Sequence, residues 1–216
     1  MSFQGKARVR CPSGCDPRDV QIWSFVNGGE DSLLRESLLA GDLNLISCEE
    51  CGAIFHPEAT VVYYDAEAEI LAFVLPESYR SEEALWRKKM DEDHVQMRKI
   101  LPQDGLISVE PRIYFGMDLL RQELAEEDAL GAQVQIARLL CKNEKLTPYL
   151  VERSFARPKN LPWILPCRGS ASLGSAKQGV KAILAINDRL EGYRRWQEVL
   201  TSLKALPPGT SRGSRS

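Results

Sequence analysis

The alternation of apolar and polar residues changes its period near residue 76, and this change divides the chain into two kinds of structure. Before residue 76, short runs rich in Val, Ile, Phe, Tyr and Trp alternate with a period of about two, which predicts strands. One short helix, starting at Asp31 or Ser32 and stopped by Gly41, is expected among them. The predicted strands cover residues 4–10, 19–27, 43–47, 60–65 and 69–75.

After residue 76 the apolar spacing lengthens to about 3.6 residues, which predicts helices. We interpret the acidic run Glu126-Glu127-Asp128 as a solvated break between two of them, and residues 106–109 as a short strand or linker. The stretch 147–175, rich in Pro and Gly, is expected to be irregular. The predicted helices cover residues 81–101, 113–127, 129–141 and 175–203. The fold class that follows is α+β, an antiparallel sheet followed by a mainly helical C-terminal half.

The composition is that of an ordinary folded protein. The chain has 216 residues, of which 44% are hydrophobic and 27% charged, enough for one large or two small domains. No apolar run approaches the roughly 18 residues that a membrane-spanning helix needs. The N-terminus lacks the hydrophobic segment of a signal peptide. We therefore expect a soluble, cytoplasmic protein with no membrane partner.

Charge is distributed unevenly along the chain. The balance is −7 for residues 1–75, −4 for 76–144 and +9 for 145–216. An acidic front and a basic rear indicate either docking within the chain or a basic surface for an outside partner.

Four of the six cysteines form two pairs with the spacing of metal-binding turns. They lie in Cys11-Pro12-Ser13-Gly14-Cys15 and Cys48-Glu49-Glu50-Cys51-Gly52, with 32 residues between the pairs. Each pair follows a predicted strand and has a glycine at its turn, where backbone N–H groups can donate to thiolates. Four thiolates close the tetrahedral shell of a zinc ion, so such an ion has no open position for water or substrate. We predict one structural Zn²⁺ bound by Cys11, Cys15, Cys48 and Cys51. Four thiolates and one Zn²⁺ would bring the net charge of residues 1–75 from −7 to about −9, which disfavours phosphate binding by this part of the chain.

Other uses of these cysteines are less favoured. Disulfides are disfavoured because a cytoplasmic chain keeps its thiols reduced. A redox dithiol at Cys48 and Cys51 lacks the βαβ context of thioredoxin-like sites. Cys167 lies next to the positive charge of Arg168, which could make its thiol reactive. A thiol-based redox sensor or enzyme therefore stays open as an alternative function.

The remaining Cys and His residues have simpler interpretations. Cys141 ends an apolar helix and is expected to be buried as a small hydrophobic residue. His56 could substitute as a ligand but is better explained as a surface or packing histidine. With His56 and His94 the only histidines, a His-based hydrolytic centre is poorly supported.

The basic last helix is the other feature with functional potential, because no nucleotide-binding or hydrolase motif is present. Arg189, Arg194, Arg195 and Trp196 are a combination that could contact nucleic acid or an anionic partner. The helix also carries a continuous apolar stripe, which more often packs inside the protein or against a partner helix. Nucleic-acid binding through residues 145–204 is therefore an alternative to a role in binding another protein.

The Gly- and Ser-rich stretch 169–175 precedes a predicted helix. It is better explained as a connector than as a site that binds phosphate.

Several short motifs between residues 8 and 101 occur together in a recognisable order. They are Val9-Arg10-Cys11-Pro12, Gly41-Asp42-Leu43-Asn44, Cys48-Glu49-Glu50-Cys51-Gly52, Tyr63-Tyr64-Asp65, Leu75-Pro76, Trp86 and Gln96-Met97-Arg98. With these motifs, residues 8–101 resemble the CpXC domain family, which is named for its Cys-Pro-x-Cys turn. The first turn departs from the family pattern, because Ser13 and Gly14 place two residues between Pro12 and Cys15 where the family has one.

The resemblance implies a zinc-ribbon-like sheet and no established reaction. We expect a zinc-binding domain over residues 1–110, a helical region over 111–204 and a disordered tail over 205–216. The preferred hypothesis is a non-enzymatic module that binds an unidentified protein partner or a second copy of itself.

Overall fold

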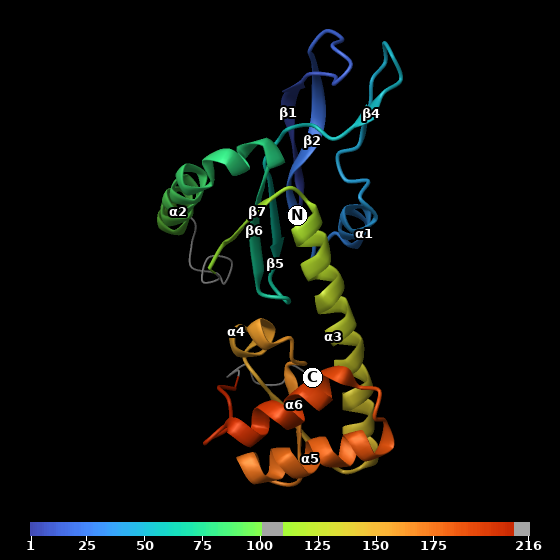
Figure 1. Cartoon of the computed structure of the whole chain (residues 1–216), viewed down its shortest axis with the longest axis vertical. Helices are drawn as coiled ribbons and strands as arrows, with labels where there is room; N and C mark the ends of the chain where they lie inside the picture. Colours follow the sequence, from blue (N-terminus) through green and yellow to red (C-terminus); the bar gives the residue numbers. More distant parts are fainter. Residues whose placement is uncertain (101–109, 210–216) are drawn as a thin grey trace. The chain divides into compact units, whose positions relative to one another are not determined.

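The computed structural model describes residues 1–100 and 110–209 and divides the chain into two compact units, Met1–Ala125 and Glu126–Ser216 (Figure 1). Each unit has a hydrophobic core of its own. The fold class is α+β, as predicted, with a sheet in the first unit and mostly helices in the second. None of the helices within residues 1–100 and 110–209 is long and apolar enough to cross a membrane.

The sheet of the first unit is mixed, which corrects the prediction of an antiparallel sheet. Its strands lie in the order β1-β2-β5-β6-β7, with β1/β2 and β5/β6 antiparallel and β2/β5 and β6/β7 parallel. Within each antiparallel pair, one strand follows the other in the chain without a helix between them. Helices lie between β2 and β5 and between β6 and β7, and these longer connections allow the paired strands to run in the same direction. The strands are β1 (Phe3–Val9), β2 (Arg18–Asn27), β5 (Val61–Asp65), β6 (Ile70–Leu75) and β7 (Arg112–Phe115).

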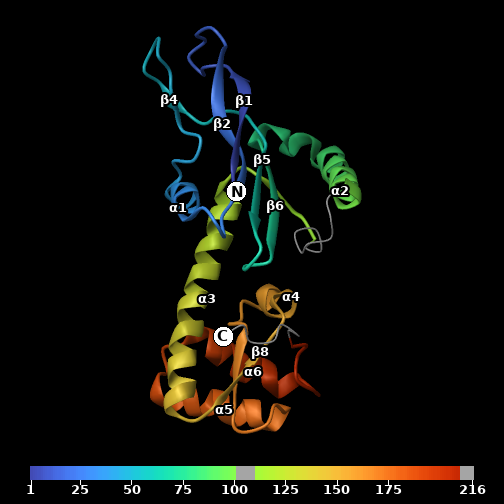
Figure 2. The ribbon, with the colours of Figure 1, turned by 180° about the vertical axis from the view of Figure 1, so that it is seen from behind.

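Helices cover both faces of this sheet. Helix α1 (Ser32–Ala40), which ends at Gly41 as predicted, and the start of α3 pack on one face, and α2 (Glu83–Ile100), entered through η1 (Glu77–Glu82), packs on the other (Figures 1 and 2). Strand β6 sends Ala72 and Val74 to one core and Phe73 and Leu75 to the other, so every residue of the strand is buried.

A second, smaller hairpin leaves the sheet between α1 and β5. It is formed by β3 (Ile46–Ser47) and β4 (Ile54–Phe55), which pair antiparallel over two residues each. Of the strand predicted for residues 43–47, only Ile46 and Ser47 form a strand. Asn44 adopts a positive φ of 61° and turns the chain just before them.

One continuous helix, α3 (Asp118–Asn143), replaces the two helices predicted for 113–127 and 129–141. The interpretation of residues 126–128 as a solvated break is wrong. Glu127 is only 8% exposed and pairs with Arg153 at 2.8 Å and Arg157 at 2.5 Å. Compensation by two arginines some 30 residues away removes the cost of burying this carboxylate within the helix.

The second unit is more regular than predicted. The stretch 147–175 holds a hairpin in which Pro148 lies opposite Pro166, a pairing allowed because each strand of a two-stranded sheet is an edge. The single helix predicted for 175–203 is two helices, separated at residues 187–190. The elements are β8 (Thr147–Leu150), α4 (Arg153–Ala156), η2 (Arg157–Lys159), β9 (Ile164–Cys167), α5 (Leu173–Ile186) and α6 (Glu191–Ser202).

The ends of the predicted regions also differ from the structure. The first unit extends beyond the boundary expected at residue 110, because β7 pairs with β6. Residues 205–209 were expected to be disordered, but Gly209 pairs with Val151 and Pro207 accepts a hydrogen bond from Tyr149. Residues 210–216, and the strand or linker predicted at 106–109, lie outside the described residues.

Candidate metal centre

The first cysteine turn connects β1 to β2. Cys11 follows the buried Val9, and Gly14 donates its backbone N–H to the carbonyl of Cys11 at 3.0 Å. Gly14 has a φ of +86°, a conformation that side-chain-bearing residues rarely adopt. The glycine therefore permits the reversal that brings Cys15 back toward Cys11.

The second turn is built in the same way at the end of the β3/β4 hairpin. Gly52, with a φ of +73°, donates to the carbonyl of Cys48 at 2.8 Å. Cys48 in turn donates to the carbonyl of Ala53 at 2.8 Å, which closes the hairpin around the Cys48 and Cys51 pair. Both turns thus place their sulfurs at the end of a hairpin.

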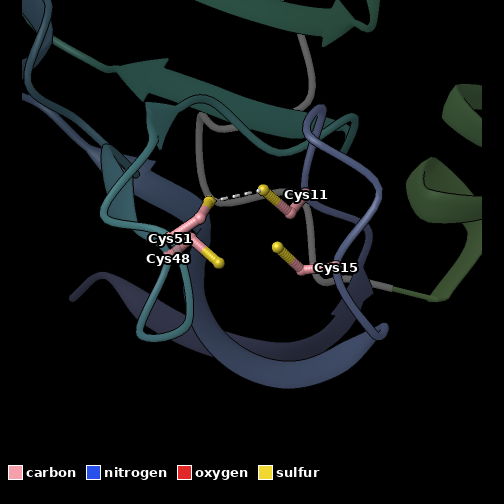
Figure 3. Close-up of side chains that lie close together, drawn as sticks. All are labelled: Cys11, Cys15, Cys48 and Cys51. Atoms are coloured by element: carbon pink, nitrogen blue, oxygen red, sulfur yellow. Dashed lines mark hydrogen bonds between the residues drawn. The ribbon is translucent and has the colours of Figure 1, made fainter.

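The four sulfurs converge on one point (Figure 3). All four Sγ atoms lie within 4.8 Å of one another, and Cys11 Sγ is 3.6 Å from Cys51 Sγ. A tetrahedron of thiolates about 2.3 Å from a zinc ion has edges of about 3.8 Å, so the spacing is close to what such an ion requires. Cys11 and Cys48 are buried, Cys15 is half-buried and Cys51 is exposed.

The electrostatics of the cluster also favour a cation. A backbone hydrogen bond from Ala53, supported by the Ser13 hydroxyl, lowers the pKa of Cys51 from 9.0 to about 6. A hydrogen bond with Cys51 is the largest of the causes that raise the pKa of Cys15. Neighbouring sulfurs therefore resist joint ionisation, as like charges at short range do. A bound cation removes this repulsion and lets every thiol lose its proton.

Arg18 ties the two turns together, and sequence reasoning missed it. Its guanidinium lies at the start of β2, donates to the Ser47 carbonyl at 2.5 Å and pairs with Glu49 at 2.6 Å. The side chain therefore holds the second turn against the first hairpin. No local pattern signals this contact, because the partners are 29 or more residues apart.

The other cysteines and histidines lie apart from this cluster. Within residues 1–100 and 110–209, the four cysteines are the single group of His, Cys, Asp or Glu side chains close enough to hold a metal ion. His56 is exposed, and His94 is buried at 5% exposure on α2. Cys141 is buried, as predicted, and Cys167 is buried too. Burial raises the pKa of both thiols, which opposes the reactive role considered for Cys167.

The structure separates the residues predicted to form a basic binding surface. Arg189, Arg194 and Arg195 are exposed, with Arg194 paired to Asp188 and Arg195 donating to the Asn160 carbonyl. The prediction that Trp196 takes part in this surface is wrong. Its side chain is fully buried and its indole N–H donates to the Pro162 carbonyl at 2.7 Å. The apolar stripe of this helix faces the core of its own unit.

Comparison with known proteins gives one match. The CpXC protein family matches residues 9–130, which is more than half of the chain and extends beyond the resemblance noted in the sequence. The matched stretch contains both cysteine turns, strands β2 to β7 and the beginning of α3. No curated protein and no solved structure matches the chain. The chain therefore belongs to the CpXC protein family.

Proposed function

We propose that Cys11, Cys15, Cys48 and Cys51 bind one structural Zn²⁺ and that the chain is a non-enzymatic interaction module. The observation that carries this proposal is the convergence of four sulfurs within 4.8 Å. A set of four soft thiolates in a tetrahedral arrangement suits zinc or an iron–sulfur centre. The two short cysteine turns, with Gly14 inside the first and Gly52 after the second, favour zinc because they resemble the paired turns of structural zinc sites.

The ion would act by holding two hairpins together. The β3/β4 hairpin has only two residues in each strand, too few for stability in water without additional support. Zinc in small modules contributes about 10–16 kcal/mol of apparent folding free energy. With four protein thiolates in the shell there is no position for a substrate, so the ion supplies structure and charge compensation and takes no part in a reaction.

Exposed apolar residues next to the cysteines support a docking role. Leu45 is 44% exposed and Ile54 is 68% exposed. Ile54 lies opposite Ser47 in the register, so these two residues share one face of the β3/β4 hairpin, and Leu45 immediately precedes β3. Apolar side chains on a metal-fixed hairpin suit contact with a partner protein or a second copy of the chain. A reducing, cytoplasmic compartment is part of the proposal, because only reduced thiols bind the ion.

The alternatives have less support. Nucleic-acid binding through residues 145–204 would lack aromatic stacking on α6, because Tyr193 and Trp196 are both fully buried. Binding that weakens by orders of magnitude between low and moderate salt would nevertheless favour it. A thiol-based sensor or enzyme would need one cysteine that reacts rapidly and selectively in the metal-loaded chain.

The docking proposal is tested by substitution on the hairpin face. Bound proteins are compared by quantitative affinity capture for the wild type, Ile54→Asp and Leu45→Asp, with self-association followed by sedimentation. Leu85→Asp, at a position 60% exposed on α2, is the matched control. Loss of the same partner, or of dimer, in both hairpin variants but not in the control would support the proposal, provided that metal content is unchanged. Equal binding by all four proteins would contradict it.

A further inference from the structure

The first unit holds a cavity that is separate from the cysteine cluster. Its volume is about 330 Å³, near the lower limit of small-molecule sites. It lies where β6 ends, with the C-terminal end of α1, the segment after β4 and the first turn of α3 around it. The apolar part of its wall includes Leu38, Leu43, Val61 and Val74. An alkyl group would therefore be favoured inside it.

Several fixed contacts keep the cavity open. The side chain of Asn44 bonds in both directions with the backbone of Trp23, at 2.8 and 2.9 Å, and so holds the turn at one side. Arg121 donates to the Leu39 carbonyl at 3.2 Å and thereby links α3 to the end of α1. These bonds make the cavity a preformed feature of the unit.

The charged groups around the cavity are mostly acidic. Glu58, Glu77 and Asp118 line it, together with the guanidinium of Arg121 and the imidazole of His56. Arg121 is already paired with Asp118 at 3.2 Å, and Glu77 is held by Arg80. Glu58 is exposed and has no partner among the described residues. Among the three acidic residues that line the cavity, Glu58 is therefore the one whose carboxylate is not paired with an arginine.

The helix ends do not reverse this sign. Helix α1 ends at the cavity with Leu38 and Gly41, and the C-terminal end of a helix carries partial negative charge. The start of α3 carries the opposite partial charge, which balances that of α1. The Glu58 carboxylate therefore leaves negative charge beside an apolar interior.

A metal ion does not fit this pattern. In the part of the chain that the structure describes, the acidic groups here are not close enough together to form a metal-binding group. We propose that the cavity binds an aliphatic amine, with its alkyl body against Leu43, Val61 and Val74 and its ammonium group at Glu58. The amine could be a free small molecule or a lysine side chain of a partner, and both present the same chemistry.

The test titrates the full-length chain with n-hexylamine, n-hexanoate and n-hexanol, which share one alkyl body and differ in charge. Binding is followed by NMR of the methyl groups of Leu38, Leu43, Val61 and Val74. We expect hexylamine at millimolar concentration to shift these signals more strongly than the other two probes do. A capped tripeptide with a central lysine distinguishes the sources: tighter binding than hexylamine indicates a protein lysine, and weaker binding indicates a free amine.

Two variants and a control locate the binding. Glu58→Gln should weaken hexylamine binding by about two- to fivefold, the effect of one exposed ion pair. Ala59→Leu, which fills part of the cavity, should weaken binding of all three probes. Glu67→Gln, at an exposed position in the β5/β6 hairpin, should leave binding unchanged. Hexanoate binding as tight as that of hexylamine, no methyl shifts with hexylamine, or equal binding by Glu58→Gln and wild type would overturn the proposal.

Discussion

Replacement of Cys48 by serine removes one donor from the cysteine cluster with little change in volume. Cys48 is 5% exposed, and its backbone bonds with Gly52 and Ala53 do not involve the sulfur. Serine therefore fits the turn, but its hydroxyl stays protonated near neutral pH and is a poor ligand for zinc. The serine itself should not disturb the turn, so any unfolding of the variant results from loss of the metal.

The expected effect is large because the contribution of zinc is comparable with the stability of a whole domain. Structural zinc contributes about 10–16 kcal/mol of apparent folding free energy, whereas a whole domain is stable by about 5–15 kcal/mol. The β3/β4 hairpin adds two residue pairs of its own, and Arg18 adds one partly exposed contact. We expect Cys48→Ser to lose the metal and to unfold the first 76 residues, while the second unit keeps its core.

Elemental analysis and hydrogen exchange measured segment by segment check this prediction. Residues 1–76 should lose protection in Cys48→Ser, and residues 126–209 should keep it. Cys141→Ser is the matched control, because Cys141 is buried in the core of the second unit and is not one of the four clustered cysteines. The reasoning is refuted if Cys48→Ser keeps one metal ion per chain, or if Cys141→Ser loses the metal to the same extent.

Three further predictions concern the second unit. Glu127→Ala removes the buried carboxylate that pairs with the half-buried Arg153 and Arg157, and it should lower the free energy of unfolding by about 3–5 kcal/mol in urea titrations; a loss below 1 kcal/mol would contradict the buried pairing. A Cβ at Gly179 would lie 2.2 Å from the Pro166 carbonyl oxygen, so Gly179→Ala should lower the melting temperature. Gly174→Ala, with open space around it in the same helix, should raise it slightly, and equal effects of the two would show that the contact with β9 is unimportant. Burial raises the pKa of Cys141 from 9.0 to about 11, so stability from its neutral thiol is fully present below pH 9 and declines toward pH 11. Urea titrations at pH 8 and pH 10 should show a smaller decline in Cys141→Ala than in wild type, and parallel declines would contradict this assignment.

The features that could be predicted from the sequence depend on local chemistry. Cysteines three or four positions apart, each pair with a glycine at its turn, specify metal-binding turns without knowledge of the fold. Helix α1 and its stop at Gly41 follow in the same way from residues that are neighbours in the chain. Strand β6 was found because apolar residues fill both of its faces.

The features that were missed depend on distant partners. The acidic run in α3 resembles a solvated break until Arg153 and Arg157 are placed beside Glu127. The direction of β5 depends on the connection that precedes it, which is invisible in the pattern of the strand itself. The prediction of helix from residue 113 is wrong at its start, because residues 112–115 form β7 and pair with β6. The amine cavity is assembled from short segments between Leu38 and Arg121, none of which carries a motif.

Metal stoichiometry by elemental analysis of the untagged chain, combined with a count of reactive thiols, tests the zinc site most directly. We predict one zinc ion per chain and no rapidly reacting thiol in the native protein. After unfolding without chelator, Cys141 and Cys167 should react first, and a chelator should release the remaining four. A chain without metal would contradict a four-cysteine zinc site, and a metal-free chain with fewer than six titratable thiols would indicate disulfide chemistry instead.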